Sequence, residues 1–427
     1  MKNTQNLNRK INIGFISTRL SGTDGVSLEA AKWCQVLEED GFNCFFMAGE
    51  LDRLEGKSVI VPEMHFNHPE ILAITQACFG SQHRNPIITK RIYELKEKFK
   101  SDIYSFIKDF GIDLLIPENA LTVPVNIPLG LAICEVIAET GIMTIAHHHD
   151  FYWERKRFLV NAVGDYLSMA FPPKLPTIRH VVINSIAERE LSYRIGISSM
   201  LVPNVMDYEK PHVHGNGYSS DIRYALGIED DEFFILQPTR VVQRKGIEHA
   251  IELVSRLDLK AKLVISHASG DEGQSYERRL MEYAKLLNVN TVFVSEVIGR
   301  ERGMTKDRQK IYNLSDAYTH CDLVTYPSYA EGFGNAFLEA VYYRKPIFVN
   351  NYSTFSTDIK PKGFRAIIFD GHITEETLKQ AREVLLNPSI CKEMTDYNYE
   401  LGLKYFSFSV LKQKLRTLIA DCFGVSQ

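Results

Sequence analysis

Strand-like apolar runs alternate with helical segments along almost the whole chain, and this alternation constrains the fold more than any other feature. Residues 11–20 read as a buried strand, residues 21–25 (SGTDG) as a turn, and residues 26–40 carry apolar side chains at helical spacing. Residues 50–88, rich in Pro, His and Asn, are expected to form an elaborated loop with a short helix, before a long charged helix at 89–110. Further first-half strands are predicted at 44–48, 113–117, 142–146, 178–184 and 200–203.

A second series of the same kind follows residues 206–220, where Pro, His, Gly and Asn gather as in a linker. Strands are predicted at 232–238, 262–266, 291–294, 323–326, 346–349 and 366–369, and residues 375–423 are expected to be helical throughout. Alternating strands and helices indicate parallel sheets covered on both faces. With 427 residues, we expect an α/β protein of two Rossmann-like, doubly wound domains that face a cleft, residues 1–205 and 206–405.

Bulk properties exclude several classes of protein. The net charge of -4 gives no sign of a nucleic-acid binder or a basic membrane anchor. Charged residues interrupt the apolar runs well short of the ~20 residues of a membrane span, and the polar start MKNTQNLNRK does not resemble a signal peptide. Seven scattered cysteines, without a CxxC pair, predict reduced thiols in a cytoplasmic protein.

The sharpest functional signal is EGFGNAFLE at residues 331–339, after the predicted strand at 323–326. Gly332 and Gly334 allow the backbone to approach a ligand, and a helix beginning near Asn335 would present free N–H groups to an anion. Glu339, one turn into that helix, suits a ribose diol, while Glu331 would face a sugar. Two isolated glutamates at this spacing are more often a loop and a solvated helix face, but the strand, glycine loop and helix together favour a ligand site.

A basic loop, RVVQRKG at residues 240–246, follows the predicted strand at 232–238. Arg240 and Lys245 stand at the carboxyl end of that strand, where two cations can neutralise a diphosphate leaving group without a metal. Alone, such a loop is more often a solvated turn. Beside the glutamate–glycine motif in the same half, it favours a phosphate site.

Three consecutive histidines mark the first half, within HHHDFYWERKR at residues 147–157. In an extended chain, His147 and His149 point one way and His148 the other. The HxH pair beside Asp150 raises the alternative of a metal site, but no other Cys or His pattern completes it, so no metal is expected. A purely structural role for two of the three histidines is the plainer alternative.

These stretches, in this order, resemble the retaining glycosyltransferases of family 4 (glycosyl transferases group 1), which have the GT-B fold. Residues 202–207 (VPNVMD) are similar to the family's PNG(V)D segment, with Val205 where glycine is usual, and residues 312–328 are similar to the run that leads into its glutamate motif. The resemblance covers residues 11–350 and is strongest in the second half. It implies a transferase that uses a nucleotide diphosphate sugar and no cofactor, with a last helix at 406–427 that crosses back to the first domain.

Carried over residue by residue, the resemblance implies three sets of contacts. The catalytic set is Glu331, Arg240, Lys245 and His148, the last favoured because H-x-D looks like the family pattern. The donor-binding set is Gly25, Glu296, Val297, Phe333, Gly334, Asn335 and Glu339. The acceptor-binding set is Asp24, His149, Asp150, Trp153 and Arg155.

The resemblance also implies a front-face substitution, since nothing in the sequence identifies a nucleophile on the far side of the sugar. An aromatic side chain at Trp153 beside Arg155 and Arg157 suggests an anionic acceptor, although a charged, solvated helix start is an equal alternative. The HHHDFYWER stretch resembles family members that join sugars to glycerate or similar small solutes, which implies GDP-mannose or UDP-glucose and a small soluble acceptor.

Three other functions stay open: a glycoside phosphorylase, a nucleotide-sugar epimerase and a non-catalytic nucleotide-sugar sensor. A phosphorylase would not need the ribose contact of Glu339, and a sensor would not need a sugar-facing Glu331. The sequence leaves open the donor base and sugar, the linkage, and whether the chain forms a homo-oligomer.

Overall fold

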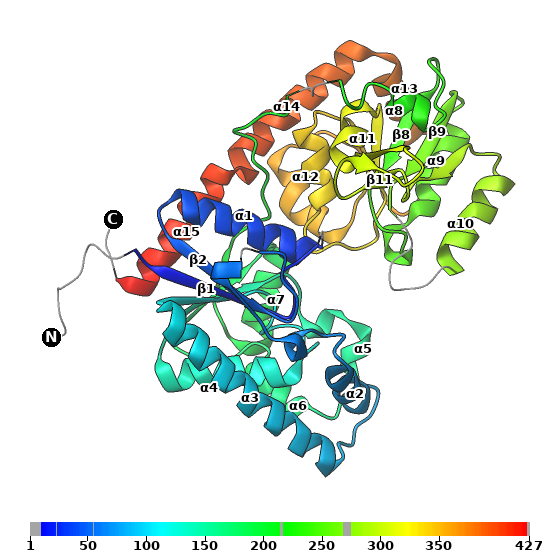
Figure 1. Cartoon of the computed structure of the whole chain (residues 1–427). Helices are drawn as coiled ribbons and strands as arrows, with labels where there is room; N and C mark the ends of the chain where they lie inside the picture. Colours follow the sequence, from blue (N-terminus) through cyan, green and yellow to red (C-terminus); the bar gives the residue numbers. More distant parts are fainter. Residues whose placement is uncertain (1–9, 23, 54, 214–216, 268–274, 425–427) are drawn as a thin grey trace. The chain divides into compact units, whose positions relative to one another are not determined.

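The computed structural model describes residues 10–22, 24–53, 55–213, 217–267 and 275–424. These residues divide into two compact units (Figure 1). The first unit contains the described residues up to Pro203 together with those from Ser409 onward, and the second runs from Asn204 to Phe408. The chain therefore crosses between the units twice, after Pro203 and after Phe408.

A seven-stranded sheet forms the centre of the first unit, in the order β3-β2-β1-β4-β5-β6-β7. Its strands are β1 (Asn12–Ser17), β2 (Asn43–Ala48), β3 (Ser58–Ile60), β4 (Leu114–Pro117), β5 (Met143–His148), β6 (Ile178–Val182) and β7 (Ser199–Leu201). Every neighbouring pair is parallel. A parallel sheet needs helices on its faces to shield its apolar strands, and the predicted Rossmann-like architecture of this half is confirmed.

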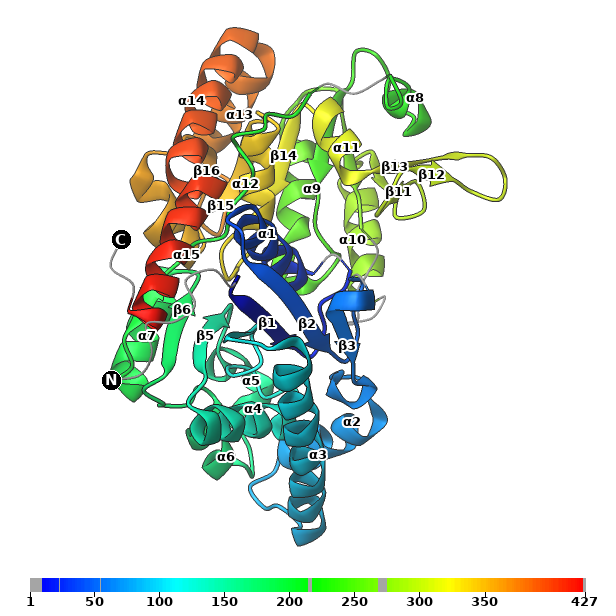
Figure 2. The ribbon, with the colours of Figure 1, turned by 60° about the vertical axis from the view of Figure 1, so that its left-hand side comes forward.

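The helices of the first unit are α1 (Gly25–Glu39), α2 (Pro69–Cys78), α3 (Pro86–Phe110), α4 (Ile127–Thr140), α5 (Lys156–Leu159), α6 (Gly164–Ala170), α7 (Ser185–Ile195) and α15 (Phe408–Phe423). Apolar side chains of α2, α3, α4 and α6 pack with those of the strands in one core. Asn85 and Asn126 begin α3 and α4 by accepting hydrogen bonds from backbone N–H groups of the first turn. The last helix, α15, lies beside α1 (Figures 1 and 2), where Arg416 donates to Asp40 at 2.6 and 2.7 Å.

A six-stranded sheet forms the centre of the second unit, in the order β10-β9-β8-β14-β15-β16. Its strands are β8 (Phe233–Gln237), β9 (Ala261–Ile265), β10 (Thr291–Phe293), β14 (Leu323–Tyr326), β15 (Ile347–Asn350) and β16 (Ile367–Phe369), all parallel. The helices are α8 (Ile222–Ala225), α9 (Ile247–Arg256), α10 (Ser275–Leu286), α11 (Leu314–His320), α12 (Asn335–Tyr342), α13 (Glu375–Leu386) and α14 (Pro388–Phe406). Side chains of α9, α10 and α13 form a core with the sheet.

Four features differ from the sequence-based expectation. The stretch at 50–88 adds β3 to the edge of the first sheet. The helical end is divided into three helices, because Pro388 starts α14 and Ser407 separates α14 from α15. A small sheet of β11 (Ile298–Gly299), β13 (Lys310–Asn313) and β12 (Gly303–Met304) projects from the second unit (Figure 2). The expected linker, 206–220, belongs to the second unit as far as it is described; residues 214–216 lie outside the described residues.

The structure bears on two sequence-based expectations, reduced thiols and no membrane-spanning helix. All seven cysteines lie in the described part of the chain and are free thiols. Within the same described residues, no helix is both long enough and apolar enough to cross a membrane.

Candidate functional site

The basic loop after β8 meets the glutamate motif after β14, since these two strands are neighbours in the sheet. Lys245 and Arg244 both bind the carboxylate of Glu331: the Lys245 ammonium donates to Oε1, and Arg244 donates to Oε2 at 3.1 Å. The side chains of Lys245 and Glu331 are each 10% exposed. Burial raises the pKa of Glu331, but the two cations outweigh it and hold the pKa below its ordinary value. The structure thus joins two of the predicted catalytic residues and adds Arg244.

Glycine is required where these two loops touch. Gly246 has a φ of +59°, and a Cβ there would lie 2.5 Å from the carbonyl oxygen of Pro327. The Tyr329 N–H donates to the Arg244 carbonyl at 2.9 Å and fastens the loops together. Because only glycine fits this approach without strain, the G of RVVQRKG is what lets Lys245 reach Glu331.

The predicted helix start is confirmed: α12 begins at Asn335, immediately after Gly334. Gly334 has a φ of +138°, and a Cβ there would lie 2.4 Å from the Tyr352 hydroxyl. That hydroxyl donates to the Phe333 carbonyl at 2.9 Å, and the Asn335 side chain accepts from Asn204 at 2.7 Å. The backbone leading into α12 is therefore held in one conformation. The N–H groups of Phe337 and Leu338 donate to the Gly334 carbonyl at 3.0 and 3.2 Å, which leaves those of Asn335 and Ala336 as the first-turn donors that the helix itself does not use.

Glu339, the predicted ribose ligand, is bound by a buried tyrosine. The Tyr318 hydroxyl donates to Glu339 Oε2 at 2.8 Å. Tyr343 stacks on Tyr318 with ring centroids 5.0 Å apart and an interplanar angle of 7°. Burial and the Glu339 charge raise the pKa of Tyr318 well above its ordinary value, so the hydroxyl keeps its proton. The sequence analysis did not single out Tyr318.

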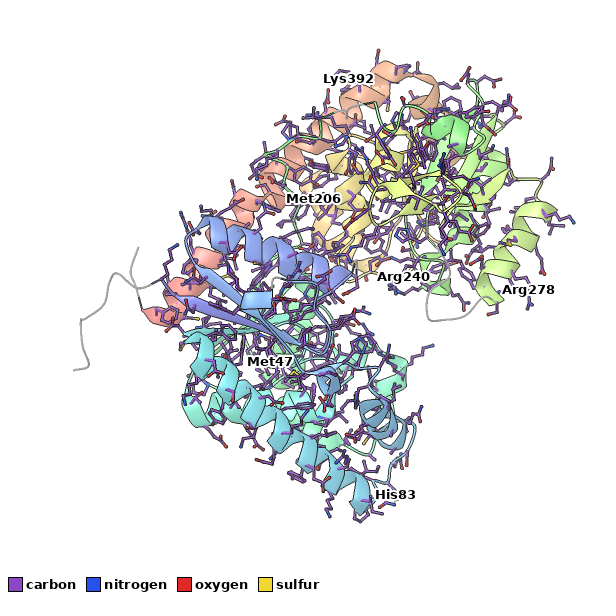
Figure 3. All side chains as sticks on the ribbon, in the orientation of Figure 1. Met47, His83, Met206, Arg240, Arg278 and Lys392 are labelled. Carbon is purple, nitrogen blue, oxygen red and sulfur yellow. The ribbon has the colours of Figure 1, made fainter. Side chains whose placement is uncertain are left out.

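The remaining predicted donor contacts lie at the same edge of the second sheet. Arg240 is exposed after β8 (Figure 3), and its charge, with that of Lys245, adds to burial in lowering the pKa of His267. Glu296 is exposed in the turn after β10. The Val297 N–H donates to Val294 and its carbonyl accepts from Tyr312, so the backbone of Val297 is already used within the fold.

In the first unit, two of the three histidines converge on a carboxylate that the sequence analysis missed. Glu118 follows β4, the neighbour of β5, and its side chain is fully buried. Glu118 Oε2 lies 2.9 Å from His147 Nδ1 and 3.2 Å from His149 Nε2. The HxH pair thus gains a third group of metal-ligand type, with ligand atoms within 4.8 Å of one another. Both nitrogens lie at hydrogen-bond distance from one oxygen, the geometry of two N–H donors sharing an acceptor.

His148 points away from Glu118, as the alternation of a strand requires. Its Nε2 lies 2.8 Å from His180 Nδ1, and its Nδ1 is buried without a partner among the described residues. Burial, with the nearby His180, lowers the pKa of His148 well below its ordinary value, and burial lowers that of His180 to about 4. The structure therefore places this predicted catalytic residue in a sealed, uncharged pair.

Asn119 fastens the segment that follows β5. Its Oδ1 accepts from the His149 N–H at 3.0 Å, and its Nδ2 donates to Asp150 Oδ1 at 2.8 Å. Asn119 has a φ of +55°, a conformation that non-glycine residues rarely adopt. Such strain persists where the surrounding structure enforces it, often beside a functional site.

The other first-unit residues that were predicted to bind substrate already have partners within the fold. Asp24 caps α1, whose first residue is Gly25, and accepts from Arg19 at 3.2 Å. Asp150 pairs with Arg155, and Trp153 stacks on Phe151 with centroids 4.4 Å apart. Thr23, in the predicted SGTDG loop, lies outside the described residues.

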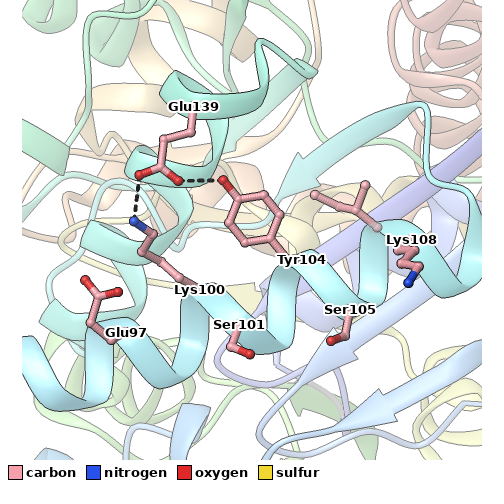
Figure 4. A pocket seen from close by; sticks show the side chains of 8 residues that line it. Glu97, Lys100, Ser101, Tyr104, Ser105, Lys108 and Glu139 are labelled. Carbon is pink, nitrogen blue, oxygen red and sulfur yellow. Dashed lines mark hydrogen bonds and ion pairs between the residues drawn. The ribbon is translucent and has the colours of Figure 1, made fainter.

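A surface hollow elsewhere in the first unit does not belong to this set. It is lined by side chains of α3 and the end of α4, where Lys100 and Tyr104 both donate to Glu139 (Figure 4). The predicted site residues lie instead at the ends of the strands, in the loops that follow them, or in the first turns of the next helices, where ligands bind in parallel α/β sheets.

Comparison with known proteins bears on the same residues. The family model for glycosyl transferases group 1 matches residues 219–401, which include both second-unit motifs. Mannosylglucosylglycerate synthase of Thermotoga maritima is 31% identical, over 94% of this chain and 98% of its own length. The Petrotoga mobilis protein of the same name is 32% identical, over 83% of this chain and 86% of its own.

Solved structures share the fold at low identity. A glycosyltransferase from Rickettsia africae superposes with a TM-score of 0.70 at 13% identity, over 98% of this chain and all of its own. Anabaena HepE in complex with UDP and glucose superposes with a TM-score of 0.66 at 12% identity, over 96% of this chain and all of its own.

Proposed function

This chain belongs to the glycosyl transferases group 1, enzymes of the GT-B fold, and we propose that it is a retaining, metal-independent hexosyltransferase. In this proposal it moves mannose from GDP-mannose, or glucose from UDP-glucose, to a hydroxyl of a small soluble acceptor that carries a carboxylate. The observation that carries the proposal is the buried Lys245–Glu331 pair, joined by the more exposed Arg244, a few residues ahead of the start of α12.

The second unit supplies the donor contacts in this proposal. Arg240 and Lys245 bind the diphosphate, and the first-turn N–H groups of α12, with the backbone of Phe333 and Gly334, bind phosphate or sugar oxygens. Glu339 accepts from the ribose hydroxyls, and Glu296 with Val297 borders the base. Before the donor arrives, Lys245 and Glu331 satisfy each other, which avoids an unpaired charge in a buried place.

Catalysis follows from charge stabilisation rather than from a protein nucleophile. The acceptor hydroxyl attacks the anomeric carbon on the face from which the diphosphate departs, so the old carbon–oxygen bond breaks as the new one forms. The hydroxyl proton passes to an oxygen of the departing phosphate. Lys245 and Arg240 stabilise the negative charge that grows there, which is why no metal ion is needed. Glu331 orients the transferred sugar through its hydroxyls.

The first unit supplies the acceptor contacts, and the structure changes which histidine we assign. His148 is paired with His180 in a sealed place, whereas His149 lies just beyond the end of β5 and is 8% exposed. We therefore place His149, rather than His148, against the bound substrates. Asp24, Gly25, Asp150, Trp153 and Arg155 border the acceptor, and Arg155 shares its charge between Asp150 and the acceptor anion.

The acceptor follows from the relatives' names. A mannosylglucosylglycerate synthase forms a product with a glycerate carboxylate, so the proposed acceptor is glucosylglycerate or a similar sugar acid and the proposed donor sugar is mannose. Purified protein is incubated with EDTA, GDP-mannose or UDP-glucose, and glucosylglycerate, and released nucleotide and product are measured. Acceptor-dependent GDP release with an α-linked product supports the proposal. A β-linked product contradicts retention, a strict metal requirement contradicts metal independence, and phosphate-dependent cleavage of a disaccharide indicates a phosphorylase.

A further inference from the structure

The buried carboxylate of Glu118 has no part in the function proposed above, yet it binds two of the three histidines. We propose that Glu118 and Asn119 are positioning residues that hold His149 as a cationic N–H donor toward an oxygen of a bound substrate. The inference rests on the proposed function only in naming that substrate as the donor or acceptor of a sugar transfer.

Of the three histidines, His149 alone has a ring nitrogen left for a ligand. His147 binds Glu118 through Nδ1, and its Nε2 is buried without a partner. His148 binds His180 through Nε2, and its Nδ1 is sealed in the same way. His149 binds Glu118 through Nε2. Unlike the second ring nitrogens of His147 and His148, its Nδ1 is not one of the buried nitrogens that lack a partner among the described residues. An ionised carboxylate only accepts, so the proton that Glu118 binds is on Nε2 and Nδ1 is the atom turned to the substrate.

The charges around His149 favour its cationic form. Besides Glu118, the charged groups that act on His149 are Glu29 on α1 and Asp150 in its own segment, both acidic, and Glu29 is bound by Lys32. Burial lowers the pKa of His149, but the bond to Glu118 and these charges outweigh it, so the pKa lies above its ordinary value. His147 is stacked on Trp33 at 4.1 Å, and burial keeps its pKa low. One cation, on His149, therefore balances the single charge of Glu118.

Asn119 fixes the orientation of His149. Asn119 binds the backbone N–H of His149 and the side chain of Asp150, so the segment after β5 cannot turn independently of β4. The Asn119 N–H also donates to the His147 carbonyl at 2.9 Å. Glu118 thus holds the proton on the His149 imidazole, and Asn119 fixes the orientation of the His149 backbone. A preorganised cation of this kind is most effective where negative charge develops.

The test uses Glu118→Gln, which keeps the shape of the side chain and removes its charge. Asn119→Gly is the second variant, since glycine accepts the same backbone conformation without the amide clamp. Glu135→Gln is the matched control, because Glu135 is a partly buried carboxylate that, like Glu118, binds two basic side chains, Lys96 and Lys100, but it lies on α4. The protonation of His149 is followed by nitrogen-15 NMR of the imidazole without substrates, and kcat/KM is measured from pH 5 to pH 9.

In Glu118→Gln the titration of His149 is expected to move to lower pH. The ratio of variant to wild-type kcat/KM falls on the alkaline side, by about tenfold for each unit of that movement, and recovers toward pH 5. Asn119→Gly is expected to lower kcat/KM at every pH without moving the titration. A larger rise in KM for the donor, or for the acceptor, identifies whose oxygen His149 binds.

Other results would overturn the inference. An unchanged His149 titration in Glu118→Gln does so even if transferase activity is found, and a failed transferase assay leaves the NMR measurement intact. One bound zinc or similar ion per chain, lost in Glu118→Gln, would show that the three side chains are a metal site instead. A loss of kcat/KM that is the same at every pH in Glu118→Gln would indicate a merely structural carboxylate.

Discussion

Replacing Lys245 by alanine tests whether its charge serves catalysis or only the folded state. The Lys245 side chain is 10% exposed, and its ammonium binds Glu331 and lies 5.4 Å from the centre of the Tyr326 ring. Removing one preorganised charge from a site where negative charge develops lowers kcat by about 100-fold or more, or ~2.7 kcal/mol. The same change leaves Glu331 with Arg244 and no lysine, and this lowers the free energy of unfolding by about 1–3 kcal/mol.

A double variant separates the two effects. Lys245→Ala with Glu331→Gln removes the unbalanced carboxylate, so stability in urea should return while kcat stays low. Lys260→Ala is the control, since Lys260 is likewise paired with acidic side chains, Glu229 and Asp231, but directly precedes β9, at the amino ends of the strands. Saturating donor and acceptor are used, with nucleotide release as the assay. A fall in kcat of less than threefold in Lys245→Ala, or recovery of kcat in the double variant, would refute the assigned role.

Three further changes have outcomes that the structure determines. Tyr318→Phe removes the hydrogen bond to Glu339 and should raise the donor KM about two- to tenfold with little change in kcat, the scale of one net hydrogen bond; an unchanged KM would separate Tyr318 from donor binding. Gly246→Ala should lower the free energy of unfolding by at least about 1–3 kcal/mol because of its positive φ and the nearby Pro327 carbonyl, whereas Gly303→Ala, whose Cβ would meet no described atom within 4 Å, should be nearly neutral. Asp40→Asn removes the partner of Arg416, whose hydrogen bond is the main reason that the pKa of Asp40 lies below 3.8. A group with a lowered pKa contributes stability above its unfolded pKa, and that contribution is lost as the pH falls through its folded pKa. The protection of the wild-type α15 amides, measured relative to intrinsic exchange at each pH, should therefore fall on acidification, and Asp40→Asn should lose this pH dependence.

The local sequence pattern was sufficient to predict the elements around the glutamate motif of the second unit, because the strand, the loop and the helix follow one another directly in the chain. The runs at 323–326 and 331–339 became β14, a glycine loop and α12, with the helix starting at the predicted Asn335. Short elements carried too little signal. The two-residue strands β11 and β12 exist through pairing with β13, and no window of two residues shows a period. The separation of α14 from α15 likewise depends on a contact, since Ser407 pairs with Met206.

The cluster of Glu118 with two histidines in the first unit could not be derived from sequence, because Glu118 is distant from them along the chain. Glu118 is 29 residues from His147, and only the pairing of β4 with β5 brings their carboxyl ends together. A signal existed, since Glu118 and Asn119 directly follow a predicted strand and parallel strands end at one edge. The H-x-D spacing favoured His148, but spacing cannot reveal that His180 on β6 occupies its far side.

Both units place a buried carboxylate after one strand and a basic side chain after or within its neighbour. Glu331 after β14 meets Lys245 after β8, and Glu118 after β4 meets His147 and His149 of β5 and its loop. Packing alone does not account for this, because apolar residues of similar volume are often as stabilising as a buried ion pair. A carboxylate that must be neutralised does, however, fix the position and protonation of its partner before any substrate binds. A phosphate or sugar oxygen that arrives then meets a cation already oriented, and the cost of ordering that cation has been met during folding. Glu118→Gln and Glu331→Gln should therefore raise the activation free energy of kcat/KM by more kcal/mol than they lower the free energy of unfolding.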